Sequence, residues 1–265
     1  MNYQIYCQLL HPELYFLIQK LVHMKNFEQT HAKNVAGCED LVTYCTAFGT
    51  RYNPSNESIS LASLANQYNL GSAAMAAVAA VLPAQTTAVA VKNKAYEPLD
   101  KLVTRVLNNF ASSGALPAEI KKAMALAKKI RGESTPTDKA KQAKLEGKKP
   151  RSNSQQSMDM RMENFGLFIE VVAVNTKYQP NEPELQVPSL QNYLAQLKVV
   201  TQEVTVAGIP VTAAKSNRNA VLYTEETGLV PVCRAAKKYL RSILPPDSPE
   251  YKKISAIKFF TFRKR

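Results

Sequence analysis

The sequence predicts an all-α protein made of two tandem four-helix up-and-down bundle units that arose by internal duplication. Residues 41–64 match residues 167–190 without a gap, and the motif Tyr-x-Pro occurs in both copies, at 52–54 and 178–180. Apolar residues recur at steps of three and four through most of the chain, as on the buried face of an amphipathic helix. The repeat defines the architecture, and the periodicity defines the fold class.

The first repeat, residues 24–132, is expected to contain four helices. Their predicted ranges are 32–48, 60–81, 84–112 and 118–130. We expect Pro83 to separate the second helix from the third, because a proline lacks the backbone N–H and clashes with the preceding turn. Pro98 predicts a kink or a local restart in the third helix. Gly132 is placed to cap the fourth.

The second repeat, residues 158–265, restates this plan. The predicted helices are 162–174, 189–203 and 211–244, followed by a short last helix. Gly208 and Pro210 are expected to form the break that corresponds to Pro83. Thr227-Gly228 is the predicted place of an interruption in the third helix, and Ser248 with Pro249 has the residue types of a helix start.

Two segments lie outside the repeats. Residues 1–23 contain no Ala and carry Pro12 in their middle. We expect this segment to be either upstream translated sequence before a start at Met24 or a mobile N-terminal helix. Its apolar run is too short for a signal sequence or a membrane span. Residues 133–157 are rich in Lys, Ser, Gln and Pro without an apolar stripe, which is typical of a flexible basic linker.

The sequence lacks the residue patterns of most enzymes. The histidines are His11, His23 and His31, all at or before the first helix, so that general-base, nucleophile-pair and most metal chemistries lack their usual partner. There is no phosphate-binding glycine loop and no nucleophile elbow. We therefore expect a protein that is not an enzyme, with no catalytic residue, no metal site and no cofactor.

The cysteines indicate a reducing compartment. Cys7, Cys38, Cys45 and Cys233 form no CxxC pair. Cys38 and Cys45, seven residues apart on one helix, would lie about 10 Å apart, too far for a disulfide. We expect reduced thiols in the core, a cytoplasmic location and no membrane association.

Positive charge is concentrated at the end of each repeat. The net charge is +13; the two basic stretches, 121–151 and 234–265, each carry about +8, and the rest of the chain is slightly acidic. The candidate phosphate or nucleic-acid contacts are Lys121, Lys122, Lys128, Lys129, Arg131, Arg234, Lys237, Lys238, Arg241, Lys252 and Lys253. The simpler interpretation of these residues is a solvated face near helix C-termini, where the helix dipole favours cations. The alternative is a surface that binds phosphates.

The recurring Tyr-x-Pro motif is interpreted as structural. Tyr52 and Pro54, and in the second copy Tyr178 and Pro180, follow the first helix of each repeat. A proline directs the residue before it away from helical geometry. We expect each tyrosine to fix the crossover to the next helix.

Several motifs resemble those of a family of uncharacterised bacterial proteins built from duplicated helical-bundle repeats. They include Leu222-Tyr223, the Thr227–Val230 segment, Lys237-Lys238-Tyr239 and the segment that begins at Ser248-Pro249. Tyr52-Asn53-Pro54 is similar to the same family. The resemblance covers nearly all of the chain after Met24, and it implies an architecture without an established activity.

Two functions follow from these observations. The first is a non-enzymatic structural or interaction protein whose helical grooves bind an unknown protein partner. The alternative is a nucleic-acid-binding protein that uses the basic last helices and the linker. A steep loss of nucleic-acid affinity with added salt would distinguish the second from the first. The oligomeric state does not follow from the sequence.

Overall fold

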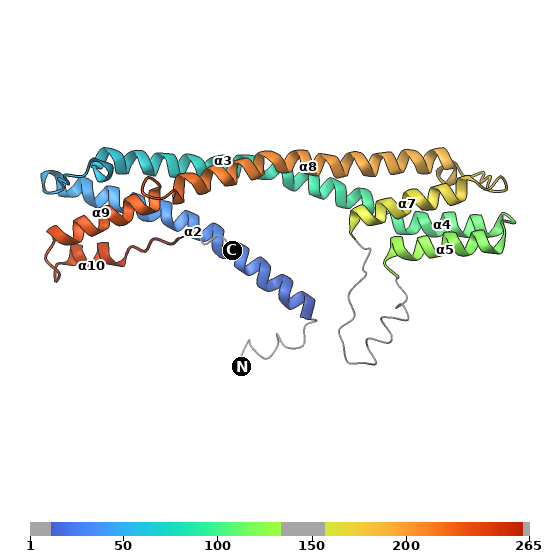
Figure 1. Cartoon of the computed structure of the whole chain (residues 1–265), viewed down its shortest axis with the longest axis horizontal. Helices are drawn as coiled ribbons and strands as arrows, with labels where there is room; N and C mark the ends of the chain where they lie inside the picture. The colour runs from blue at the N-terminus through green and yellow to red at the C-terminus, as the bar shows by residue number, and fades with distance from the viewer. Residues whose placement is uncertain (1–11, 134–156, 262–265) are drawn as a thin grey trace. The chain divides into compact units, whose positions relative to one another are not determined.

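The computed structural model describes residues 12–133 and 157–261, with side chains described from Thr30 onward, and it is all-helical (Figure 1). No strand occurs in these ranges, which confirms the all-α fold class. In chain order the helices are α2 (Pro12–Phe48), α3 (Leu61–Tyr96), α4 (Leu99–Ser112), α5 (Pro117–Arg131), α7 (Met158–Ala173), α8 (Val187–Tyr223), α9 (Leu229–Ile243) and α10 (Pro249–Ala256). Short 3-10 turns at Gly49–Arg51, Glu57–Ile59 and Pro183–Leu185 complete the two crossovers.

The two predicted proline breaks are wrong. Pro83 lies inside α3 and Pro210 lies inside α8, and both helices continue for about three and a half turns beyond the proline. A proline leaves the carbonyl four residues earlier without its helical partner. Those carbonyls belong to Ala79 and Val206, which are exposed, so water can satisfy them. The alanine-rich surroundings of Pro83 favour the helix further.

The second helix of each repeat ends further along the chain than the sequence predicted, at Tyr96 and at Tyr223. In the first repeat α3 ends at Tyr96 and α4 restarts after Pro98, which is the restart that this proline predicted. In the second repeat the interruption near Thr227-Gly228 is present. A side chain at Gly228 would come within 2.7 Å of the Thr224 backbone nitrogen, so only glycine fits this turn.

Other predicted helix ends are confirmed. Gly132 caps α5 in the left-handed conformation, with φ of 75°. The Ser248 side chain accepts a hydrogen bond from the Tyr251 amide and so caps α10, with Pro249 in its first turn. Helix α2 passes through Met24 without a break. Residues 1–11 and the predicted linker, apart from Glu133 and Ser157 at its ends, lie outside the described residues.

The described chain forms two compact units, and neither coincides with a repeat. Unit 1 comprises residues 1–83 and 209–265, and unit 2 comprises residues 84–208. Because α3 and α8 do not break at their prolines, each helix begins in one unit and ends in the other. Each unit therefore contains helices from both copies of the repeat, whereas the sequence led us to expect one unit per copy.

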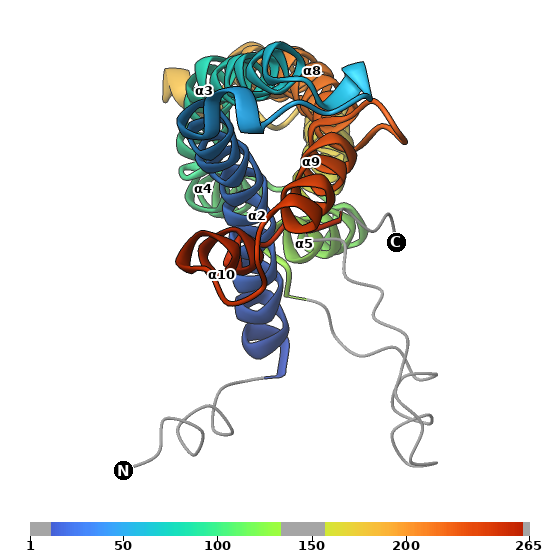
Figure 2. The same cartoon turned by 90° about the vertical axis from the view of Figure 1, so that its left-hand side faces the viewer.

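The core of unit 1 joins α2 and the start of α3 to the end of α8, α9 and α10. Helix α9 packs against both α2 and α10 (Figure 2). Cys38, Leu41 and Cys45 of α2 are fully buried against Cys233 and Leu240 of α9. These three cysteines are free thiols within the described residues.

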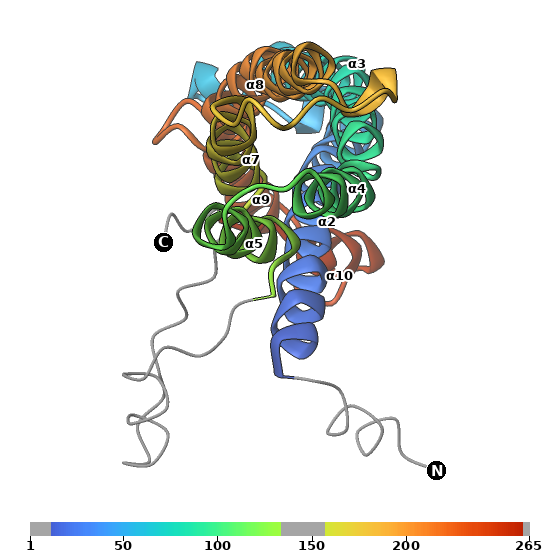
Figure 3. The same ribbon diagram turned by 90° about the vertical axis from the view of Figure 1, so that its right-hand side faces the viewer.

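The core of unit 2 joins the end of α3, α4 and α5 to α7 and the start of α8. Helix α5 packs against α7 and α4 (Figure 3). Phe110 of α4 and Phe165 and Phe168 of α7 are its largest fully buried side chains. The apolar stripes predicted for the first helix of each repeat thus face the core, but each stripe packs largely against helices of the other copy.

Candidate functional site

The basic residues of α9 are bound to the chain that follows them. In unit 1 the Arg234 guanidinium donates a 2.7 Å hydrogen bond to the backbone oxygen of Phe259. The Lys237 ammonium donates to the backbone oxygens of Ser255, at 2.9 Å, and of Ile257. Neither cation has an acidic partner among the described residues. Burial, with a contribution from the nearby Arg241 charge, lowers the pKa of Lys237.

The remaining cations of unit 1 are divided between bound and exposed. The Arg241 guanidinium donates to the Tyr251 hydroxyl at 2.9 Å and lies 5.3 Å from the centre of the tyrosine ring. Lys238, Lys252 and Lys253 are exposed. The predicted basic stripe of α9 is therefore mainly a clamp on α10 and the segment after it, and its freely accessible part is small.

The segment held by this clamp was not recognised in the sequence. Residues 257–261, here called the strap, leave α10 with extended backbone and run to α2. The buried Asn34 of α2 binds the strap through both polar atoms of its side-chain amide. Its amide nitrogen donates to the Phe260 oxygen at 3.0 Å, and its amide oxygen accepts from the Phe260 nitrogen at 2.8 Å. Gly37 lies one turn further along α2 and faces Ile257 and Phe259.

The sequence did contain one sign of the contact between α2 and the strap, namely polar residues within the apolar stripe of α2. His31 and Asn34 precede Cys38 and Leu41 on the buried face of α2, and both are at most 1% exposed. The His31 ring nitrogen lies 2.6 Å from the Tyr223 hydroxyl, to which Asn34 also donates. Buried polar groups are almost always hydrogen-bonded, so such residues indicate a specific partner.

The basic residues of α5 belong to unit 2. Lys121, Lys122 and Lys129 are exposed and Lys128 is half-buried, with no hydrogen bond or ion pair of their side chains among the described residues. The Arg131 guanidinium donates to the Thr104 hydroxyl at 2.9 Å and to the Glu133 carboxylate at 3.3 Å. The structure thus brings the α9 and α10 cations together in unit 1, and it places the α5 cations in the other unit.

Both crossover tyrosines are buried and make the same contact. The Tyr52 hydroxyl donates to the backbone oxygen of Ile59, and the Tyr178 hydroxyl donates to that of Leu185. Burial raises the pKa of both phenols, that of Tyr178 to about 12. These contacts are the ones expected of a residue that fixes the crossover. The hydroxyl of each tyrosine is used in this contact with the backbone.

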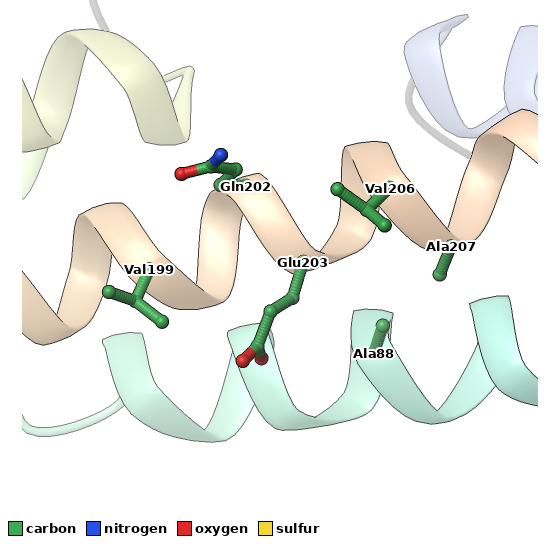
Figure 4. A pocket seen from close by; sticks show the side chains of 6 residues that line it. All are labelled: Ala88, Val199, Gln202, Glu203, Val206 and Ala207. Atoms are coloured by element: carbon green, nitrogen blue, oxygen red, sulfur yellow. The ribbon is translucent and has the colours of Figure 1, made fainter.

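An open depression of about 400 Å³ lies on unit 2 between α3 and α8. It is lined by Ala88 of α3 and by residues of α8, among them Val199, Glu203 and Val206 (Figure 4). Val199 and Val206 are 54% and 58% exposed. Glu203 is the only ionisable side chain in this lining, which offers no acid–base pair.

Helix α3 has an unusually apolar surface. The stretch Leu61–Ser112 contains a window long and apolar enough to cross a membrane by length and composition, and 11% of that window is buried. Residues 61–91 include no charged side chain. Large exposed apolar surfaces are typical of regions that contact another protein or a membrane, and a single such helix is weak evidence for a membrane span.

Within the described residues, no three His, Cys, Asp or Glu side chains are grouped so as to hold a metal ion. No protein-family model, no curated protein and no solved structure matches this chain.

Proposed function

We propose that this protein is a non-enzymatic helical interaction protein, built by duplication of a four-helix repeat, that binds a protein partner. The duplication is supported by the equivalent Tyr52 and Tyr178 hydrogen bonds, which occur at matching positions of the two copies. In this proposal the copies contribute helices to both compact units.

The exposed apolar face of unit 2 carries the functional part of the proposal. Val199 and Val206 lie seven residues apart on α8, at the spacing of one face of a helix, beside the small Ala88 of α3. A helix of a partner could lay apolar side chains against this face. The site has apolar contacts and one carboxylate, which suits recognition better than bond-making chemistry.

The test is affinity capture from the native host followed by mass spectrometry. We expect the double variant Val199→Asp, Val206→Asp to lose the main captured protein, because both charges would be buried in the contact. Val174→Asp is the matched control, since Val174 is 80% exposed in the same unit and lies outside the depression. An unchanged set of captured proteins in the double variant would refute the proposed face.

A second candidate, nucleic-acid binding, is favoured by the lysines of α5. Lys121, Lys122 and Lys129 are exposed, and none of them has an acidic partner within residues 30–133 and 157–261. Binding through them would be weakened by salt, because each neutralised phosphate releases counterions. Replacing these three lysines with Gln should reduce the salt dependence of binding to an oligonucleotide. An absence of binding by the unaltered chain at low salt would exclude this candidate.

A further inference from the structure

The strap lies against α2 and α9, and the side chains of these helices bind its backbone atoms. Asn34 pairs with both backbone atoms of Phe260, while Arg234 and Lys237 bind backbone oxygens of Phe259, Ser255 and Ile257. Three side chains of α2 and α9 therefore donate four hydrogen bonds to backbone oxygen atoms of the strap or of the end of α10. The side chains of Lys258 and Phe260 are exposed and contribute little to this fit.

A lack of side chain at Gly37 is what makes room for the strap. A Cβ atom there would lie 3.1 Å from Ile257 and 3.3 Å from the Phe259 ring. Gly37 lies inside α2 and needs no unusual backbone angle, so its absent side chain is explained by the close approach of the strap. A larger residue at this position would displace the strap without changing the charge of the protein.

The strap also accepts hydrogen bonds from two cations of α9. Arg234 and Lys237 are half-buried, have no acidic partner in the described chain, and satisfy their donors only on carbonyl oxygens. Carbonyl oxygens are weaker partners for a cation than phosphate or carboxylate oxygens. If the strap left, Arg234 would lose the Phe259 oxygen, and Lys237 would lose the Ile257 oxygen and keep the Ser255 oxygen of α10. Both cations lie on the same side of α9 as Arg241.

We infer that the strap is an autoinhibitory contact that shields Arg234 and Lys237 from the phosphate backbone of a nucleic acid. This inference rests on the nucleic-acid candidate described above, and it adds regulation to it. With the strap in its seat, binding at this unit depends on exposed lysines such as Lys238 and Lys252. With the strap displaced, Arg234 and Lys237 exchange carbonyl oxygens for phosphate oxygens and add to the binding.

The change in nucleic-acid affinity expected on displacement of the strap is opposite in sign to the change that the charge of the segment alone would predict. The segment after α10 carries Lys258 and the basic residues 263–265, so that its attachment should by charge alone favour nucleic acid. Shielding predicts instead that displacing this segment from its seat strengthens binding. The direction of the change therefore separates the two explanations.

The experiment uses two displacement variants of the full chain, Gly37→Leu and Asn34→Leu. Gly37→Leu fills the space of the strap, and Asn34→Leu removes its backbone pairing at similar side-chain volume. Gly166→Leu on α7, in unit 2, is the control for adding a leucine at a helical glycine. Hydrogen exchange at residues 257–261 reports displacement, and circular dichroism reports folding, so a variant that unfolds is recognised and the other carries the test.

Affinity for a single-stranded oligothymidylate is then measured against salt concentration. We expect both displacement variants to bind more tightly at low salt, with a logarithmic salt slope steeper by about 1.4, since each of two added phosphate contacts contributes about 0.7 on a single strand. Adding Arg234→Gln and Lys237→Gln to the Gly37→Leu chain should abolish this gain.

Each contrary result has a distinct meaning. If the unaltered chain binds and displacement leaves its affinity and salt slope unchanged, the shielding inference fails while the nucleic-acid candidate survives. A gain that persists without Arg234 and Lys237 also overturns the inference. If no form binds at low salt, both the candidate and the inference are wrong.

Discussion

The Tyr178 hydroxyl donates a 2.7 Å hydrogen bond to the backbone oxygen of Leu185, seven residues further along the chain. Its counterpart Tyr52 makes the same bond to Ile59 in the other unit. Both rings pack edge-on but against different residue types: Tyr178 meets Phe110 at 5.9 Å, and Tyr52 meets Tyr239 at 5.4 Å. What the two copies retain is thus the backbone contact that closes the crossover.

Replacing Tyr178 with Phe should therefore destabilise unit 2. The variant keeps the ring but leaves the Leu185 oxygen without its buried partner, which costs about 1–3 kcal/mol. Thermal unfolding followed by circular dichroism measures the loss. Tyr251→Phe is the control, because the Tyr251 hydroxyl interacts with Arg241 at an exposed position. Equal effects of the two changes would contradict a structural role for the buried hydroxyl.

Alkaline pH should destabilise the fold through its buried tyrosines. Burial raises the pKa of Tyr178 and of Tyr193 to about 12, from an ordinary value of 10.0. The unfolded chain releases these protons first, so the stability they contribute is complete below pH 10 and is lost as the pH rises toward 12. Denaturant titrations at several pH values would measure the decline. A stability that stays constant across this range would contradict burial of these phenols.

Replacing Pro83 with Ala should stabilise the protein. The change restores the backbone N–H that a continuous α3 lacks at this position, and removes the ring clash, for a gain of about 1–3 kcal/mol after the added freedom of the unfolded chain is counted. The melting temperature reports the change. Pro117→Ala is the contrasting control, because Pro117 occupies the first turn of α5, where proline is favourable. If the helix were instead broken at Pro83, replacing this proline with Ala would leave the melting temperature unchanged or lower it.

Cutting the chain between the repeats should leave one assembled particle. A specific protease site inserted near residue 145 separates the two copies covalently, but the core of each unit contains helices from both. We expect the two fragments to migrate together in gel filtration and to separate only in denaturant. Fragments that separate under native conditions would show that each copy folds by itself.

Local features of the fold could be predicted, and non-local ones could not. Gly132, Ser248 and the restart at Pro98 act through their own backbone geometry, so residue type was enough to place them. Pro83 and Pro210 misled the prediction, because a proline lowers helix stability without forbidding a helix that is long on both sides of it and whose freed carbonyl belongs to an exposed residue. Periodicity also cannot say which stripe packs against which, and it therefore could not reveal the exchange of helices between the copies.

The candidate sites show the same limit. The basic residues Arg234 and Lys237 were found in the sequence, but their partners are carbonyl oxygens more than 15 residues away, which carry no residue-type signal. Asn34 was missed because it lies within an apolar stripe, where a polar residue has meaning only once its partner is known. The lysines of α5 remain a prediction.

The division of the units also sets an order for folding on the ribosome. Unit 2 is one continuous stretch of chain, residues 84–208, whereas unit 1 needs the first 83 residues together with those after 208. During synthesis from the N-terminus, the segment made first must wait longest for its partners. The part of the apolar face of α2 that packs against α9 stays uncovered until α9 emerges, and a molecular chaperone would have that interval in which to act.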